Sequence, residues 1–162
     1  MPQLKGKPLL FPPPYRYSMK TSPEVELLSV VCAEASKERR LRYSHLAKLS
    51  KAFGPRLSRA LEALREGRVK KYIFKPSGRV VWVVVGRERE YIIMPTVDYC
   101  SCDDFYFRVI DGKAHLCYHL IAQRLADALE RFDLIFEEDR NYDILMGEWR
   151  EMQMRSSRGG KR

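Results

Sequence analysis

The residues best suited to chemistry in this 162-residue chain are thiol and imidazole groups that crowd into one short stretch. Three of the four cysteines and two of the three histidines lie between residues 100 and 119. Their spacing is Cys100-x-Cys102, then fourteen residues, then Cys117-x-His119. Thiolate and imidazole are ligands that zinc prefers in proteins. The pattern therefore predicts a metal site, although cysteine on its own is often a small buried hydrophobic residue.

Local geometry explains how two such pairs can meet at one ion. Side chains two residues apart on an extended segment point to the same side, so Cys100 and Cys102 can face one ion while Ser101 faces away. We expect the second pair at the first turn of a helix, where the helix dipole favours thiolate over thiol. Together the pairs form a Cys3His set for one structural Zn²⁺, because four protein ligands leave no open position for a substrate. His115 is an alternative fourth ligand, less regularly placed than His119.

The two pairs, as "YCSCDDFYFRVI" followed by "LCYHLIA", resemble the SWIM type of zinc finger. The longer form of that motif, C-x-C … C-x-H-x-x-A, is complete in this chain down to Ala122. Over roughly residues 57–150 the chain is similar to the SWIM-domain subunits of Shu-type recombination complexes, with further similarity in "KPSGRVVWVVVG" and "NYDILMGEW". Two positions depart from the family pattern: Asp103 stands where proline is common, and Tyr118 stands where a basic residue is common.

This resemblance implies a cofactor, a partner and a function. It implies a ββα-type finger that holds one zinc ion, in which the small side chain of Ala122 allows close packing beside the site; alanine is also an ordinary helix former. It further implies a non-enzymatic factor that pairs with a RecA-family recombinase paralogue. Such a factor supports recombinase filaments on single-stranded or branched DNA, directly or through its partner. The missing base at Tyr118 argues against DNA contact by the finger itself.

The elements that must position the ligands follow from hydrophobic spacing and turn residues. The sequence predicts an α+β protein in which the helix of the finger runs from about Ala114 to Phe132. The run "VVWVVV" is β-branched and predicts a strand that is buried on both faces. The expected segments are a flexible proline-rich tail (1–22), a basic helical portion with a three-stranded antiparallel meander (23–97), the finger (98–132), a helical extension (133–152) and a disordered basic tail (153–162).

Positive charge is concentrated before the finger. Residues 1–88 carry 19 Lys and Arg against 7 Asp and Glu, whereas residues 89–150 carry 7 against 13. Three helices, a strand, the turn "KPSGR" and a second strand follow the order of a winged helix-turn-helix. A solvated basic face is the plainer alternative to nucleic-acid contact. Phosphate contact is predicted for eight side chains: Arg56, Arg59, Arg65, Arg68, Lys70, Lys71, Lys75 and Arg79.

Composition and motifs limit the remaining classes of function. Apolar residues make up 45% of the chain, but the longest apolar run, Val80–Val85, is far shorter than the ~20 residues of a membrane helix. The sequence has no P-loop, HExxH or G-x-G-x-x-G motif, so we expect neither an enzyme nor a small-molecule substrate. We expect a soluble intracellular protein of the cytoplasm and nucleoid, or of the nucleus in a eukaryote.

Two other functions fit the same features. One is a winged-helix transcriptional regulator with a structural zinc ion, in which Arg56 and Arg59 lie on the recognition helix and Lys75 and Arg79 lie on the wing. The other is a zinc-stabilised adaptor that binds proteins and does not contact DNA.

Overall fold

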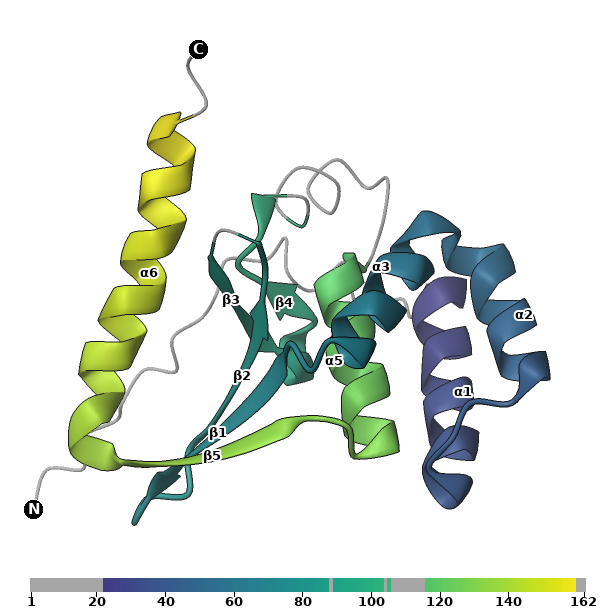
Figure 1. Cartoon of the computed structure of the whole chain (residues 1–162), viewed down its shortest axis with the longest axis horizontal. Helices are drawn as coiled ribbons and strands as arrows, with labels where there is room; N and C mark the ends of the chain where they lie inside the picture. The colour runs from purple at the N-terminus through teal and green to yellow at the C-terminus, as the bar shows by residue number, and fades with distance from the viewer. Residues whose placement is uncertain (1–21, 88, 104, 106–115, 160–162) are drawn as a thin grey trace, which may run out of the picture.

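The computed structural model describes residues 22–87, 89–103, 105 and 116–159 (Figure 1). Helices dominate the first third of the chain and strands the middle. In chain order the elements are α1 (Pro23–Glu38), α2 (Tyr43–Phe53), α3 (Pro55–Arg65), β1 (Val69–Lys75), β2 (Val80–Val85), β3 (Glu90–Met94), the 3-10 turn η2 (Pro95–Val97), β4 (Tyr99–Cys100), α5 (Tyr118–Leu129), β5 (Asp133–Glu138), the 3-10 turn η3 (Asp139–Asn141) and α6 (Tyr142–Gly159).

The strands form one mixed sheet in the order β4-β3-β2-β1-β5. The predicted antiparallel meander is present as β1, β2 and β3, and β4 adds to it antiparallel beside β3. β5 pairs with β1 in parallel, which is possible because the chain crosses over through α5 between them. The α+β class and the antiparallel meander are confirmed, but the sheet is larger than the small antiparallel one predicted, because β4 and the parallel strand β5 extend it.

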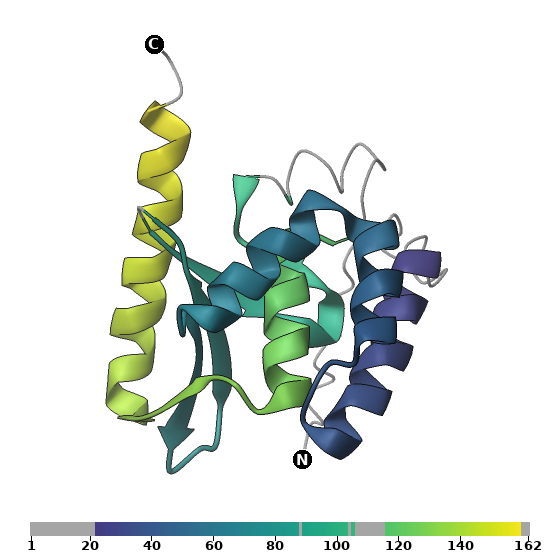
Figure 2. The same ribbon diagram turned by 45° about the vertical axis from the view of Figure 1, so that its right-hand side comes forward.

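The two faces of this sheet carry separate cores (Figure 2). α5 lies against one face, with α1 and α3 packed against it, and α6 lies on the other face. β2 contributes to both cores, because Trp82 and Val84 belong to the first and Val81 and Val83 to the second. The prediction that this strand is buried on both sides is confirmed.

Several segment boundaries differ from those predicted. The segment 133–152 is not wholly helical, because its first six residues form β5. α6 continues to Gly159, so the prediction of a disordered tail over 153–162 is wrong up to that residue. α5 begins at Tyr118 and ends at Leu129, a shorter helix than the one predicted, and Ala114 lies outside the described residues.

Ser22 is the one residue of the predicted proline-rich tail that the structure describes; the rest of that tail, 1–21, lies outside the described residues. Ser22 caps α1, and its hydroxyl oxygen accepts a hydrogen bond from the backbone N–H of Val25 at 3.2 Å. Among the described helices, none is long and apolar enough to cross a membrane.

Candidate metal centre

The structure brings the four predicted zinc ligands together at one point. The ligand atoms of Cys100, Cys102, Cys117 and His119 all lie within 4.8 Å of one another. All four residues are buried, none being more than 4% exposed. In a tetrahedral site with Zn–S bonds of about 2.3 Å, neighbouring sulfur atoms are roughly 3.7 Å apart, so this cluster needs only small shifts to close on an ion. The alternative ligand His115 lies outside the described residues.

The first pair is positioned by the short strand β4. Cys100 is the register partner of Ile93 on β3. The next residue, Ser101, turns toward β3: its N–H donates to the carbonyl oxygen of Ile92 at 3.1 Å, and its hydroxyl oxygen accepts from the Ile92 N–H at 3.0 Å. The predicted alternation is therefore confirmed, with Ser101 facing away from the cluster while Cys100 and Cys102 face it.

The second pair lies where α5 begins. Cys117 is the N-cap residue, with an extended backbone (φ −78°, ψ 166°), and His119 follows in the first turn. The positive end of the helix dipole therefore faces the cluster, where it stabilises negative charge on sulfur. The prediction placed both residues within the first turn, and the structure places Cys117 one step before it.

The three cysteine thiols of the cluster have shifted pKa values. Hydrogen bonds from Cys100 and Cys117 hold the pKa of the Cys102 thiol far below its usual value. Burial raises the pKa of Cys100 and of Cys117 above the usual value. The backbone N–H of Phe105 also donates to Cys102 Sγ at 3.2 Å. Zinc binds cysteine as thiolate, so its binding at this cluster would release the thiol protons.

His119 lies between two tyrosine rings. Its ring centroid is 4.2 Å from that of Tyr91 on β3 and 3.8 Å from that of Tyr118 on α5. Both ring nitrogens are buried without a hydrogen-bond partner among the described residues, as expected of an imidazole that serves as a metal ligand. The sequence did not single out Tyr91, although its position two residues before Ile93 on a strand was a signal that it faces the same side.

The donor set therefore fits one structural zinc ion. Three thiolates and one imidazole complete a tetrahedron, which leaves no position at which a substrate or a reactive water could bind. Ala122, also on α5, is fully buried in the same core as the ligands, where its small side chain occupies little space between α5 and its neighbours.

Arg56, a predicted DNA contact, lies beside the metal centre. Its guanidinium donates to the backbone oxygen of Leu116, directly before the ligand Cys117, at 2.6 Å. It also pairs with Glu24 in the first turn of α1 at 2.9 Å. Its side chain is only 17% exposed, and α3 packs against α5 and does not stand free as a recognition helix. This arginine therefore links α1 and α3 to the segment that enters the finger.

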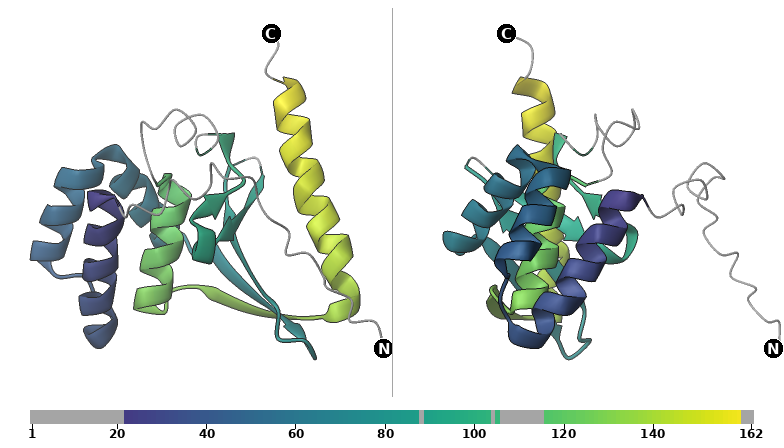
Figure 3. Two further views of the ribbon diagram at one scale, coloured as in Figure 1. Left: turned by 180° about the vertical axis from the view of Figure 1, so that it is seen from behind. Right: turned by 90° about the vertical axis from the view of Figure 1, so that its right-hand side faces the viewer.

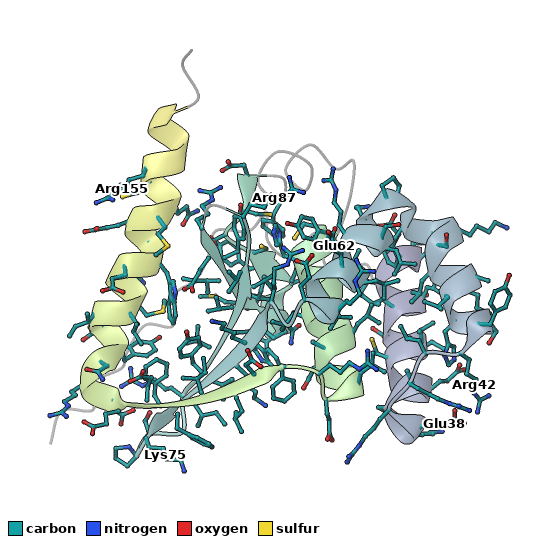
Figure 4. All side chains as sticks on the ribbon, in the orientation of Figure 1. Glu38, Arg42, Glu62, Lys75, Arg87 and Arg155 are labelled. Carbon is teal, nitrogen blue, oxygen red and sulfur yellow. The ribbon has the colours of Figure 1, made fainter. Side chains whose placement is uncertain are left out.

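The other predicted phosphate contacts are spread over the molecule. Arg65 lies exposed at the end of α3, and Lys70 is half-buried on β1. Lys75 lies at the tip of the β1–β2 hairpin, at the opposite end of β1 from α3 (Figure 4).

Four of these side chains lie over aromatic rings, which bury part of each cation. Arg59 lies 6.0 Å from the ring centroid of Tyr118, Lys71 5.1 Å from that of Trp82, Lys75 4.4 Å from that of Phe136 and Arg79 4.1 Å from that of Tyr142. Arg68 is committed to an ion pair with Glu66 at 2.9 Å and a hydrogen bond to the carbonyl oxygen of Val85 at 3.2 Å. The eight side chains do not form one continuous surface, and their contact with DNA stays a prediction.

Comparison with known proteins identifies relatives that are named as zinc finger proteins. The chain is 30% identical over 122 residues to the "Zinc finger SWIM domain-containing protein 7 homolog" of Dictyostelium discoideum, covering 73% of this chain and 78% of that protein. It is 31% identical to the human "Zinc finger SWIM domain-containing protein 7" over 126 residues, 76% of this chain and 89% of that protein. An uncharacterized protein of Archaeoglobus fulgidus is 34% identical over 84 residues, 52% of this chain and 65% of that protein. No protein-family model matches the chain, and no solved structure matches it significantly.

Proposed function

The chain belongs to the family of zinc finger SWIM domain-containing protein 7, and we propose that it is a non-enzymatic accessory factor of homologous recombination and DNA repair. In this proposal it forms a complex with a RecA-family recombinase paralogue and supports recombinase filaments on single-stranded DNA. The resemblance of its finger to those of Shu-type SWIM subunits supports this assignment.

The observation that carries the proposal is the closed Cys3His centre. All four ligands are buried and belong to the larger of the two cores or contact it, so the ion serves the fold. A saturated zinc site supplies no Lewis acid and no activated water. We therefore propose that the protein acts through its surfaces and that any step driven by ATP belongs to the partner.

Contact with DNA is proposed through the partner, supplemented by exposed cations of this chain. Arg59, Arg65, Lys75 and Arg79 are the exposed members of the predicted set. The first two lie on α3 and the last two at the β1–β2 hairpin, at opposite ends of β1. Such scattered cations support contact with the phosphate backbone and do not support sequence reading.

The decisive experiment is co-expression with the RecA-type recombinase paralogue of the same genome. We expect the two proteins to co-purify with about one zinc ion per chain, and the complex to increase recombinase assembly on single-stranded DNA. The matched control is the paralogue alone. If the two proteins do not associate and recombinase assembly is unchanged, the proposal is wrong. A homodimer that protects a palindromic DNA site would instead identify a winged-helix regulator.

A further inference from the structure

The β1–β2 hairpin extends past α5 at one end of the sheet (Figures 1 and 3). Large apolar side chains are exposed there. Ile73 on β1 has Val80 on β2 and Phe136 on β5 as its direct partners, so the three side chains form one row across three strands. Leu134 lies two residues before Phe136 on the same side. We call these four residues the tip face.

The tip face is open to solvent even though its residues are large and apolar. Val80 and Leu134 are each 47% exposed, and Phe136 is 55% exposed. The helical layer ends just before it, where Phe132 covers Trp82 with ring centroids 5.0 Å apart. Contiguous exposed apolar side chains of this kind mark interaction sites, whereas isolated ones are normal on any surface.

A free strand edge borders the same surface. β5 is the last strand of the sheet and pairs with β1 alone among the described strands. Its outer N–H and C=O groups can therefore accept a further strand. Within β5 itself the charged residues are all acidic: Asp133, Glu137 and Glu138. The nearest cations belong to other segments, because Arg140 pairs with Glu138 and the Lys75 ammonium of β1 lies over the Phe136 ring. A ligand that matches this edge is an extended peptide with apolar and basic side chains.

The negative charge of the β5 carboxylates favours some ligands of this edge over others. A second copy of the chain would bring one acidic β5 edge against another, and nucleic acid would bring phosphates against the same carboxylates; both arrangements are repulsive. We propose that an extended segment of the recombinase-type partner adds as a strand to the free edge of β5, with apolar side chains on the tip face and basic side chains beside Asp133 and Glu138. This inference rests on the proposed function and specifies where its partner binds.

The test uses the full-length chain and the RecA-type recombinase paralogue of the same genome, purified separately and titrated. One variant combines Leu134→Lys with Phe136→Lys, which removes the apolar contact and repels a basic segment. The matched control combines Val30→Lys with Val97→Lys, because these side chains are 55% and 68% exposed and lie on α1 and η2. A third variant, Asp133→Lys with Glu138→Lys, tests the charge of the edge separately.

We expect the Leu134 and Phe136 variant to weaken binding by roughly 30-fold, as the loss of a central interface side chain does. The control variant should bind like the wild type, and all variants should keep their zinc content and unfolding temperature. In the wild-type complex, amide hydrogen exchange across residues 133–138 should slow, because the outer N–H groups of β5 become hydrogen-bonded.

The two levels of the proposal fail differently. If the wild-type chain does not bind the paralogue, the proposed function fails and the docking site fails with it. If the wild type binds but the tip-face variant binds equally well, or exchange at β5 is unchanged, the docking site alone is wrong. A wild-type homodimer or a DNA complex that the tip-face variant abolishes would also overturn it, since the surface would then have a different occupant.

Discussion

The two faces of the sheet are stabilised by different means. On one face, α1, α3 and α5 enclose a core that contains the three cysteine ligands Cys100, Cys102 and Cys117. On the other face, α6 is the one helix among the described residues that covers a smaller core. That helix is held by aromatic contacts: Trp149 meets Tyr72 edge to face at 5.2 Å between ring centroids. We call these two parts the zinc layer and the α6 layer.

The two layers differ in what stabilises them: metal binding in the zinc layer and side-chain packing in the α6 layer. In the zinc layer, α5 begins at a metal ligand and β4 is only two residues long, so we expect secondary structure there to depend on the ion. In the α6 layer, the Trp149 indole N–H donates to Glu90 Oε2 at 2.6 Å, and packing needs no cofactor. The two layers should therefore unfold under different treatments.

Removing zinc should have the largest effect. Cys117→Ser, or treatment with a strong chelator, removes a binding free energy on the order of 10–16 kcal/mol. This is comparable with the whole stability of a typical domain, about 5–15 kcal/mol. We expect the zinc layer to unfold, with loss of α5 helicity by circular dichroism and of slow amide exchange over residues 116–129. Retention of this protection without metal would show that packing alone holds the layer.

Cys32 provides the matched control for the zinc prediction. Its Sγ lies 3.6 Å from the backbone oxygen of Arg124, and burial raises its pKa to about 11, so it stays a thiol. Cys32→Ser should cost about 1 kcal/mol or less and leave one zinc ion bound. A drop in zinc content for this variant would contradict the ligand set.

Removing the central aromatic of the other layer should have the next largest effect. Trp149 is 3% exposed, and Trp149→Ala leaves a cavity beside Tyr72 and an unpaired Glu90. We expect a loss of about 3–5 kcal/mol in the free energy of unfolding, measured with urea. Zinc content should be unchanged and exchange should accelerate in α6. The control is Ile144→Ala on the same helix, where the side chain is 62% exposed. Loss of zinc from the Trp149 variant would mean that the layers are not independent.

The zinc layer and the α6 layer also differ in how far the sequence predicts them. Few residue types bind zinc, and the four ligands lie in two short pairs, Cys100-x-Cys102 and Cys117-x-His119. The ligands of the metal centre could therefore be identified from the sequence. The β-branched run of β2 likewise predicts its burial on both faces. β5 was missed because the apolar run from Leu134 to Phe136 is short, and its conformation is decided by pairing with β1, more than sixty residues earlier.

The role of Arg56 was hidden from the sequence for a related reason. An arginine on a helix in a basic segment looks like a solvent-exposed cation, and only the folded chain brings Leu116, sixty residues later, within hydrogen-bond distance. Non-local contacts of this kind leave no periodic pattern in the sequence.

Replacing Arg56 should weaken the zinc layer without removing its metal. Arg56→Met keeps the length of the side chain but leaves the Leu116 carbonyl and the Glu24 carboxylate without this donor. We expect a loss of about 1–3 kcal/mol in the free energy of unfolding and faster release of zinc to a chelator. Arg65→Met, at an exposed position of the same helix, should be close to neutral. Equal effects of the two variants would show that the contact beside Cys117 contributes nothing.

The smallest effect is expected at the end of α1 that lies far from the metal. Hydrogen bonds from Arg42 and Arg40 lower the pKa of the exposed Glu38 carboxyl from 4.5 to about 2, and Figure 4 shows Glu38 and Arg42 side by side. Because the folded-state pKa is depressed, the stabilisation is complete above about pH 4.5 and is lost as the pH falls toward about 2. Glu38→Gln should lower the urea midpoint slightly, and by the same amount at pH 8 and pH 5. The difference should vanish in about 1 M NaCl, because salt screens exposed ion pairs. A difference that shrinks between pH 8 and pH 5, or that survives high salt, would contradict this assignment.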